Sequence, residues 1–235
     1  MILWVLLFLL IVGISFVLAY RSMKDYQEIP KNAKVEYGLY LIRQMENFNG
    51  GFLDSIGRLI SDEGLIISLE RLYKGTKAAL TIYGPKKVLE KFILTFNLLE
   101  LEDYTLNCDS KDISIWEMGT KSNPPSPDNS HILADNLSQL SEEDQFFWQV
   151  ILSAKKGKEN LSFQTQVRAV VYSKDESRKK ILTSLLQDLK LGGLIKVPKP
   201  FSTEQMLIFY HLRSLGKDSN GPVLDSEGVM RLLRA

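Results

Sequence analysis

The stretch FQTQVRAVVY, residues 163–172, decides the fold class. Apolar positions such as Phe163 and Val167 alternate with polar ones such as Gln164 and Arg168. Strict alternation predicts a half-buried strand of an antiparallel sheet. Ser173 and Glu176 follow with the spacing of a capping box, so a helix over Lys174–Leu189 is expected directly after the strand.

The residues before this strand supply its hairpin partner. QFFWQVILSA, residues 145–154, is the most apolar strand candidate beyond the N-terminus, and the basic stretch Lys155–Asn160 joins it to the first strand. A short helix over Ile132–Leu140 and a strand over Ile113–Met118 are expected upstream. The three prolines within GTKSNPPSPDNS, residues 119–130, predict an irregular loop.

The first half of the chain has a similar pattern. Leu65–Tyr73 and Ala78–Tyr83 form a predicted hairpin around Lys74-Gly75-Thr76. Gly84-Pro85 then opens a predicted helix over Lys86–Phe96.

Further elements are expected on both sides of this hairpin. Leu39, Ile42 and Met45 recur at three-residue steps, which predicts a helix over Val35–Phe48. Asn49-Gly50-Gly51 should break this helix before it resumes over Phe52–Ile60, and Tyr104–Cys108 is a short strand candidate.

Two tandem modules follow from this order. With the strand over residues 113–118, the second half reads β-α-β-β-α-β, the order of a ferredoxin-like split βαβ unit. The sequence therefore predicts an α+β chain with one α+β module over residues 35–109 and another over residues 110–197. Residues 198–235 are expected to be a tail or linker, with a helix from Ser202 to Leu212.

The N-terminus predicts a membrane anchor. ILWVLLFLLIVGISFVLA, residues 2–19, contains no charge, and a helix of that length approaches the ~30 Å thickness of a bilayer core. Residues 1–20 are thus expected to be a single transmembrane helix, and residues 21–34 a polar linker.

A cleaved signal peptide is the alternative, since Val17 and Ala19 could precede a cleavage site. No Lys or Arg precedes the apolar run, however, and the run exceeds the ~7–15 residues usual in a signal. Arg21 and Lys24 follow it, so the positive-inside rule predicts a domain on the cytoplasmic side of the inner membrane. Cys108 is the sole cysteine, which excludes an internal disulfide.

The sequence offers no catalytic signature. A phosphate-binding loop is absent, because Lys74-Gly75-Thr76-Lys77 lacks the upstream glycine. His131 and His211 lie far apart, and no cysteine–histidine cluster has zinc spacing. Neither catalytic residues, nor a cofactor, nor a metal are expected.

Basic residues are the candidate contacts to an anionic partner. The formal net charge is only +1, which argues against a strongly basic nucleic-acid-binding protein, but three local clusters remain. They lie on two predicted helices and in one hairpin loop, and could contact lipid headgroups or nucleic-acid phosphates. Their members are Lys86, Lys87, Lys91, Lys155, Lys156, Lys158, Arg178, Lys179 and Lys180.

A family resemblance rests on the order of five stretches after the anchor. They are YGLYLIRQM, LIISLERLYKGTKAALTIYGPKKVLEKF, LSEEDQFFWQVILSAKKG, FQTQVRAVVYSKDESRKKILTSLLQDL and FSTEQMLIFYHL. Together they resemble the membrane-anchored, uncharacterised N-terminal domain associated with type IV secretion or conjugation-like DNA-transfer ATPases of candidate-phyla bacteria.

The resemblance covers most of residues 35–212. It implies a scaffold that docks or assembles a P-loop translocation ATPase, and no catalytic residue is carried over, because the ATP-binding motifs of that family belong to a separate domain or chain. The other functional hypotheses are a module binding nucleic acid or anionic lipid, and an extracytoplasmic domain behind a signal peptide; a homo-oligomer is also compatible with the sequence.

Overall fold

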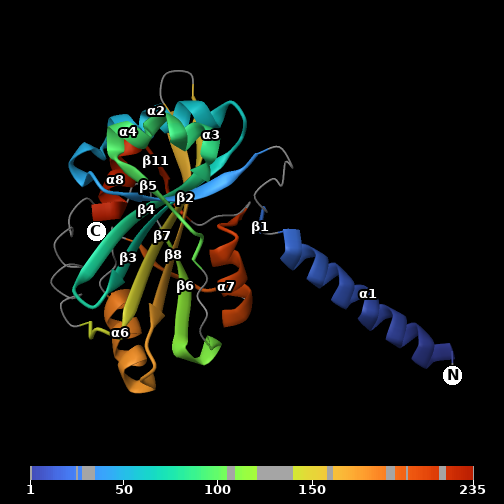
Figure 1. Cartoon of the computed structure of the whole chain (residues 1–235). Helices are drawn as coiled ribbons and strands as arrows, with labels where there is room; N and C mark the ends of the chain where they lie inside the picture. Colours follow the sequence, from blue (N-terminus) through green and yellow to red (C-terminus); the bar gives the residue numbers. More distant parts are fainter. Residues whose placement is uncertain are drawn as a thin grey trace.

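One antiparallel sheet of nine strands organises the molecule (Figure 1). The computed structural model describes residues 2–24, 26–27, 35–104, 109–120, 140–157, 161–188, 194–199, 201–216 and 221–234. The strand order is β5-β2-β4-β3-β7-β8-β6-β9, and β11 pairs with β8. The strands are β2 Tyr37–Ile42, β3 Ile66–Lys74, β4 Lys77–Pro85, β5 Leu98–Leu101, β6 Ile113–Gly119, β7 Gln145–Lys156, β8 Leu161–Tyr172, β9 Ile195–Val197 and β11 Val223–Leu224.

The sheet consists of two halves that meet at β3 and β7. Their ladder runs from Ile66 opposite Ser153 to Lys74 opposite Gln145. Counted from either outer edge, the strands of each half follow the order fourth, first, third, second in the chain. The α+β class predicted from the sequence is therefore confirmed, and the two halves share one continuous sheet.

Helices cover one face of this sheet with the main core. They include α2, Gly50–Ser61, and α6, Glu176–Asp188, together with the terminal helix α8, Ser226–Arg234. Phe52, Ile56 and Ile60 of α2 are buried in the same apolar cluster as Trp148 of β7. The opposite face carries a smaller cluster beneath α7, Thr203–His211.

The predicted helix over residues 35–48 is wrong, because Tyr37–Ile42 is strand β2. This strand lies between β4 and β5, and its side chains are buried on both faces of the sheet. A strand buried on both faces lacks polar alternation. The three-residue spacing of Leu39 and Ile42, which also occurs on one face of a helix, therefore led to the wrong prediction.

The two glycines after this strand start a helix instead of interrupting one. The Asn49 side chain caps α2 by accepting a hydrogen bond from the Phe52 amide, at 3.1 Å. Gly50 lies directly against the Glu227 side chain, where a Cβ atom would overlap the carboxylate. The helix predicted over residues 52–60 is confirmed, but the kink at the glycines is wrong.

Other predictions hold in part. Both hairpins are present, and the helix over residues 86–96 forms as α3 Lys86–Leu89, the 3-10 turn Glu90–Phe92 and α4 Ile93–Phe96. Strand β5 was not predicted, Tyr104 lies outside any strand, and residues 105–108 are outside the described part. The predicted loop over residues 119–130 and the helix over residues 132–140 fall mostly on undescribed residues.

Asp175, not Ser173, caps helix α6. Its carboxylate accepts hydrogen bonds from the amides of Ser177, at 2.8 Å, and Arg178, at 3.0 Å. Ser173 is buried, and its amide donates to the Asp112 carbonyl. The capping box predicted at Ser173 and Glu176 is therefore wrong, although the helix itself is confirmed.

The C-terminal segment wraps around the sheet instead of forming a free linker. After α7 on one face, the chain continues through β10, Leu215–Gly216, and β11. Strand β11 pairs with residues 163–164 of β8, which lie beyond the end of β6. Helix α8 then packs on the opposite face, where Trp148 donates its indole hydrogen to the Leu232 carbonyl, at 3.1 Å. Residues 201–216 and 221–234 thus belong to the folded body.

Helix α1, Ile2–Lys24, extends away from the sheet (Figure 1). The two-residue strand β1, Tyr26–Gln27, follows it and pairs with β10. In α1 the described side chains are those of Trp4 and residues 7–17. Among the residues with described side chains, which in α1 form a run of only residues 7–17, no helix combines the length and apolar character needed to cross a bilayer.

Candidate functional site

A row of polar side chains crosses the face of the sheet that carries α7. Thr81, Glu70, Gln149, Arg168 and Glu117 lie directly opposite one another on five neighbouring strands. Directly opposite residues project from the same face, so the ladder registers alone place these five groups in one line. All five are buried, so their charges and hydrogen-bonding groups require partners.

Arg213 supplies the main partner for this row. Its guanidinium donates to Glu70 Oε1, at 2.9 Å, and makes a bidentate pair with Asp103, at 2.8 and 2.9 Å. It also stacks on the Tyr83 ring, 3.9 Å from the centroid. Burial lowers the pKa of Arg213, but Glu70 and Asp103 outweigh it and leave the pKa above its usual value.

The backbone conformation at Arg213 fits this role. Its φ of +50° lies in the left-handed region, which is uncommon for a residue with a side chain. The residue ends the turn after α7 and directs the guanidinium inward toward Glu70. The surrounding ion pairs hold it in this conformation.

Two tyrosines complete the surroundings of Glu70. The Tyr104 hydroxyl donates to Glu70 Oε2, at 2.7 Å, and lies 2.6 Å from the Tyr210 hydroxyl. Since the single Tyr104 proton points to the carboxylate, Tyr210 donates to Tyr104. Burial and then the Glu70 charge raise the pKa of both phenols well above the ordinary value, so both stay protonated.

Arg168 and Glu117 form the other end of the polar row and have partners of their own. Arg168 donates to Gln149 Oε1 and to the backbone carbonyls of Phe209, at 3.1 Å, and Ser214, at 2.6 Å. Glu117 pairs with Lys199, at 3.0 Å, and accepts from the Gln166 amide, at 2.8 Å. These groups bind the segment from α7 to β10 to the sheet, so this network is a structural clamp with its acids and cations paired.

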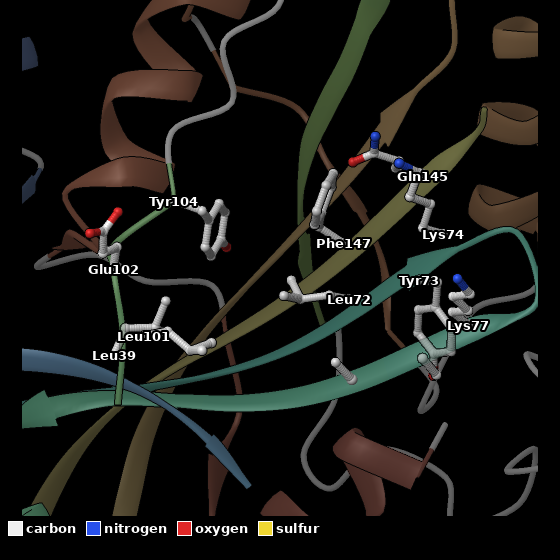
Figure 2. Close-up of a pocket in the computed structure, with 12 residues that line it drawn as sticks. Leu39, Leu72, Tyr73, Lys74, Lys77, Leu101, Glu102, Tyr104, Gln145 and Phe147 are labelled. Carbon is white, nitrogen blue, oxygen red and sulfur yellow. The ribbon is translucent and has the colours of Figure 1, made fainter. Parts of the chain in front are cut away.

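An open pocket lies beside this network (Figure 2). It encloses about 410 Å³ between the β3–β4 hairpin, the start of β7 and the segment after β5. Leu72, Leu101, Phe147 and Tyr104 give it apolar walls, and the Tyr104 and Phe147 rings stack at 6.2 Å. Lys74, Lys77 and Glu102 also line it, so it has the composition of a small-molecule site.

The predicted basic clusters are found in different surroundings. Lys86 pairs with Glu36, at 2.7 Å, and Glu100, at 2.9 Å, and these two hydrogen bonds raise its pKa above the usual value. Lys87 and Lys91 are exposed. Helices α3 and α6, which carry two of the clusters, lie at opposite ends of the molecule (Figure 1).

The cluster on α6 is engaged within the fold. Arg178 contacts Asp144, and Lys179 is buried, pairs with Glu176 at 2.6 Å and donates to the Lys111 carbonyl. Lys180 pairs with Glu176 at 3.6 Å. Lys155 is exposed and lies near the end of β7, not in the hairpin loop as predicted, while Lys158 and the Lys156 side chain are outside the described part. Binding of an anionic partner by these clusters stays a prediction.

Of the remaining cysteine and histidine candidates, His211 alone lies among the described residues. Cys108 and His131 lie outside the described residues, and burial followed by the Arg213 charge lowers the pKa of His211. Within the described part, no group of three His, Cys, Asp or Glu side chains could hold a metal ion. No family model matches the chain, and no curated protein matches it either.

Removing one partner of the buried clamp should destabilise the fold. We expect Arg213→Met to lower the free energy of unfolding by about 3–5 kcal/mol, because it leaves the Glu70 carboxylate buried and unpaired. Glu70→Gln/Arg213→Met should cost less than the sum of the two single changes. Urea unfolding of the full chain, followed by circular dichroism, measures both quantities. The exposed Arg43→Met is the control, expected within about 0.5 kcal/mol of wild type. If the cost of the double variant equals the sum of the two single costs, Glu70 and Arg213 do not stabilise each other and the proposed ion pair is contradicted.

The contact between Asp144 and Arg178 predicts an acid-dependent stability. Burial raises the pKa of Asp144, but hydrogen bonds from Arg178 and Ser141 outweigh it and lower the pKa below 3.8. A lowered folded-state pKa adds stability above the ordinary value, and this stability disappears as the pH falls through the lowered pKa. Asp144→Asn should therefore reduce the melting temperature at pH 7, and the difference should shrink below pH 3.8. A difference that does not change with pH would contradict this assignment.

Proposed function

We propose that the chain is a non-catalytic adaptor tethered to a membrane by α1. The observation that carries the proposal is the exposure of large apolar side chains along a helix outside the folded body. Trp4, Phe8 and Phe16 are 73%, 66% and 74% exposed. Apolar surface of this extent in water marks contact with an apolar partner, and the acyl region of a bilayer is one such partner.

The charges in the last turn of α1 support an orientation. Arg21 and Lys24 follow the apolar run and would remain on the cytoplasmic side of an inner membrane under the positive-inside rule. Strand β1 then joins the chain to β10. A tether attached in this way would hold the folded body close to the membrane surface.

The architecture of the body supports an adaptor role. We propose that each half is a ferredoxin-like module, and the repeated strand order supports this assignment. The two modules would form one rigid platform, since they share a continuous sheet and the C-terminal segment packs on both of its faces. The family resemblance makes a P-loop translocation ATPase the candidate partner of this platform.

Capture from membranes tests both parts of the proposal. The full chain should remain in the carbonate-washed membrane fraction of its host and co-purify with a stoichiometric P-loop ATPase. Leu10→Arg/Ile14→Arg should release it from the membrane, because each arginine at the centre of an inserted helix costs roughly 2.5–3.5 kcal/mol. Met23→Arg, at the end of α1, is the matched control and should stay membrane-bound.

Two results would contradict the proposal. A wild-type chain in the soluble fraction would exclude the anchor. Membrane capture without an ATPase would exclude the proposed partner while leaving the anchor intact.

A further inference from the structure

The pocket beside the polar clamp lies on a part of the sheet face that α7 does not fill. Tyr210 and Leu207 of α7 pack around Phe147, and Leu72 and Tyr104 border the same cluster. Leu72 and Leu101 remain partly exposed beyond it. Figure 2 shows Leu72, Tyr104 and Phe147 around the pocket, with Lys74 and Lys77 toward one end and Leu101 and Glu102 toward the other.

The sheet beneath Leu72 and Phe147 offers no free backbone groups to a ligand, and the nearest free strand edges are residues 77–80 of β4, which β2 does not reach, and β5. Strand β3 is paired along its length with β4 on one side and β7 on the other. A peptide lying on the face over Leu72 and Phe147 would therefore bury its own amides and carbonyls against apolar side chains, which costs free energy. A ligand whose body lacks polar groups avoids this cost.

The lysines define where the polar end of such a ligand would lie. Lys74 and Lys77 are directly opposite each other across the hairpin, and like charges in that position repel. Both are exposed, and neither makes an ion pair with another described residue. An anion between them would relieve the repulsion, whereas the exposed carboxylate of Glu102 would disfavour an anion at the other end.

The dimensions suit an elongated molecule. The two ends of the pocket are at Lys77 of β4 and Leu39 of β2. Leu39 lies opposite Tyr83, which is six positions from Lys77 along β4. At ~3.3 Å per residue, the distance between the two ends is about 20 Å. The pocket volume of about 410 Å³ lies within the range found for small-molecule sites.

We propose that this pocket binds a single-chain amphiphile, with its anionic head between Lys74 and Lys77 and its acyl tail along Leu72 and Phe147 toward Leu101. The ligand class is a long-chain carboxylate. The apolar walls bind the tail, and the two lysines select the charge of the head.

Photolabelling of the full chain in nanodiscs of zwitterionic phosphatidylcholine tests the proposal. The probe is dodecanoic acid with a diazirine near the end of its tail, and the comparison probe is a trimethylammonium amphiphile with the same tail. Peptide mass spectrometry identifies the labelled residues, which separates the pocket from α1. The carboxylate probe should label the peptides containing Leu101 and Phe147, and unlabelled dodecanoate should compete with it.

Charge reversal provides the matched comparison. Lys74→Glu/Lys77→Glu should reduce pocket labelling roughly tenfold, with labelling of α1 unchanged. Lys87→Glu/Lys91→Glu, an equal charge change at exposed positions of the helical segment over residues 86–96, should label like wild type. Equal labelling by both probes, labelling confined to α1, or no response to the change at residues 74 and 77 would overturn the proposal.

Discussion

The ion pair between Arg213 and Glu70 is the interaction on which the C-terminal half of the structure depends. Glu70 is completely buried on β3, where the two halves of the sheet meet, and a carboxylate in that position needs a cation. Arg213 comes from the far end of the chain and also binds Asp103. The folded state of the first half therefore requires the residues that follow α7.

This requirement explains the path of the C-terminus. With Arg213 fixed under the α7 turn, the chain passes beside β8 as β11 and places α8 against α2 on the opposite face. Trp148 and Arg71 then bind carbonyls of the final helix. One segment thus contacts both faces and both halves, while the outer strands β5 and β9 are short, as is usual for edges that resist further pairing.

Sequence reasoning identified the elements with local signals. The hairpins around residues 75 and 157 and the helices α2, α6 and α7 have alternation, helical spacing or caps that depend only on neighbours. Strand β2 was missed because burial on both faces removes alternation. The clamp was missed because Glu70 and Arg213 are separated by 143 positions, and a single charged residue in an apolar strand does not indicate its partner.

The same limit applies to the predicted sites, because contacts made in the folded chain cannot be read from the sequence. Lysine clusters are visible in the sequence, but the ion pairs of Lys86 with Glu36 and of Lys179 with Glu176 depend on side-chain placement. The pocket was not predicted, since Leu72, Leu101 and Phe147 come from three strands that only the sheet brings together. The signal that the sequence offered for the clamp was a charged residue within a largely apolar strand, such as Glu70 in β3 or Arg168 in β8.

Hydrogen–deuterium exchange of the wild-type chain tests most directly whether the C-terminal segment is integral to the fold. If the Arg213 clamp joins it to the sheet, the amides of residues 212–216 should exchange as slowly as those of β7 and β8, through global unfolding. Rapid exchange of residues 212–216 while β7 and β8 stay protected would contradict the account, because the segment would then open independently of the sheet.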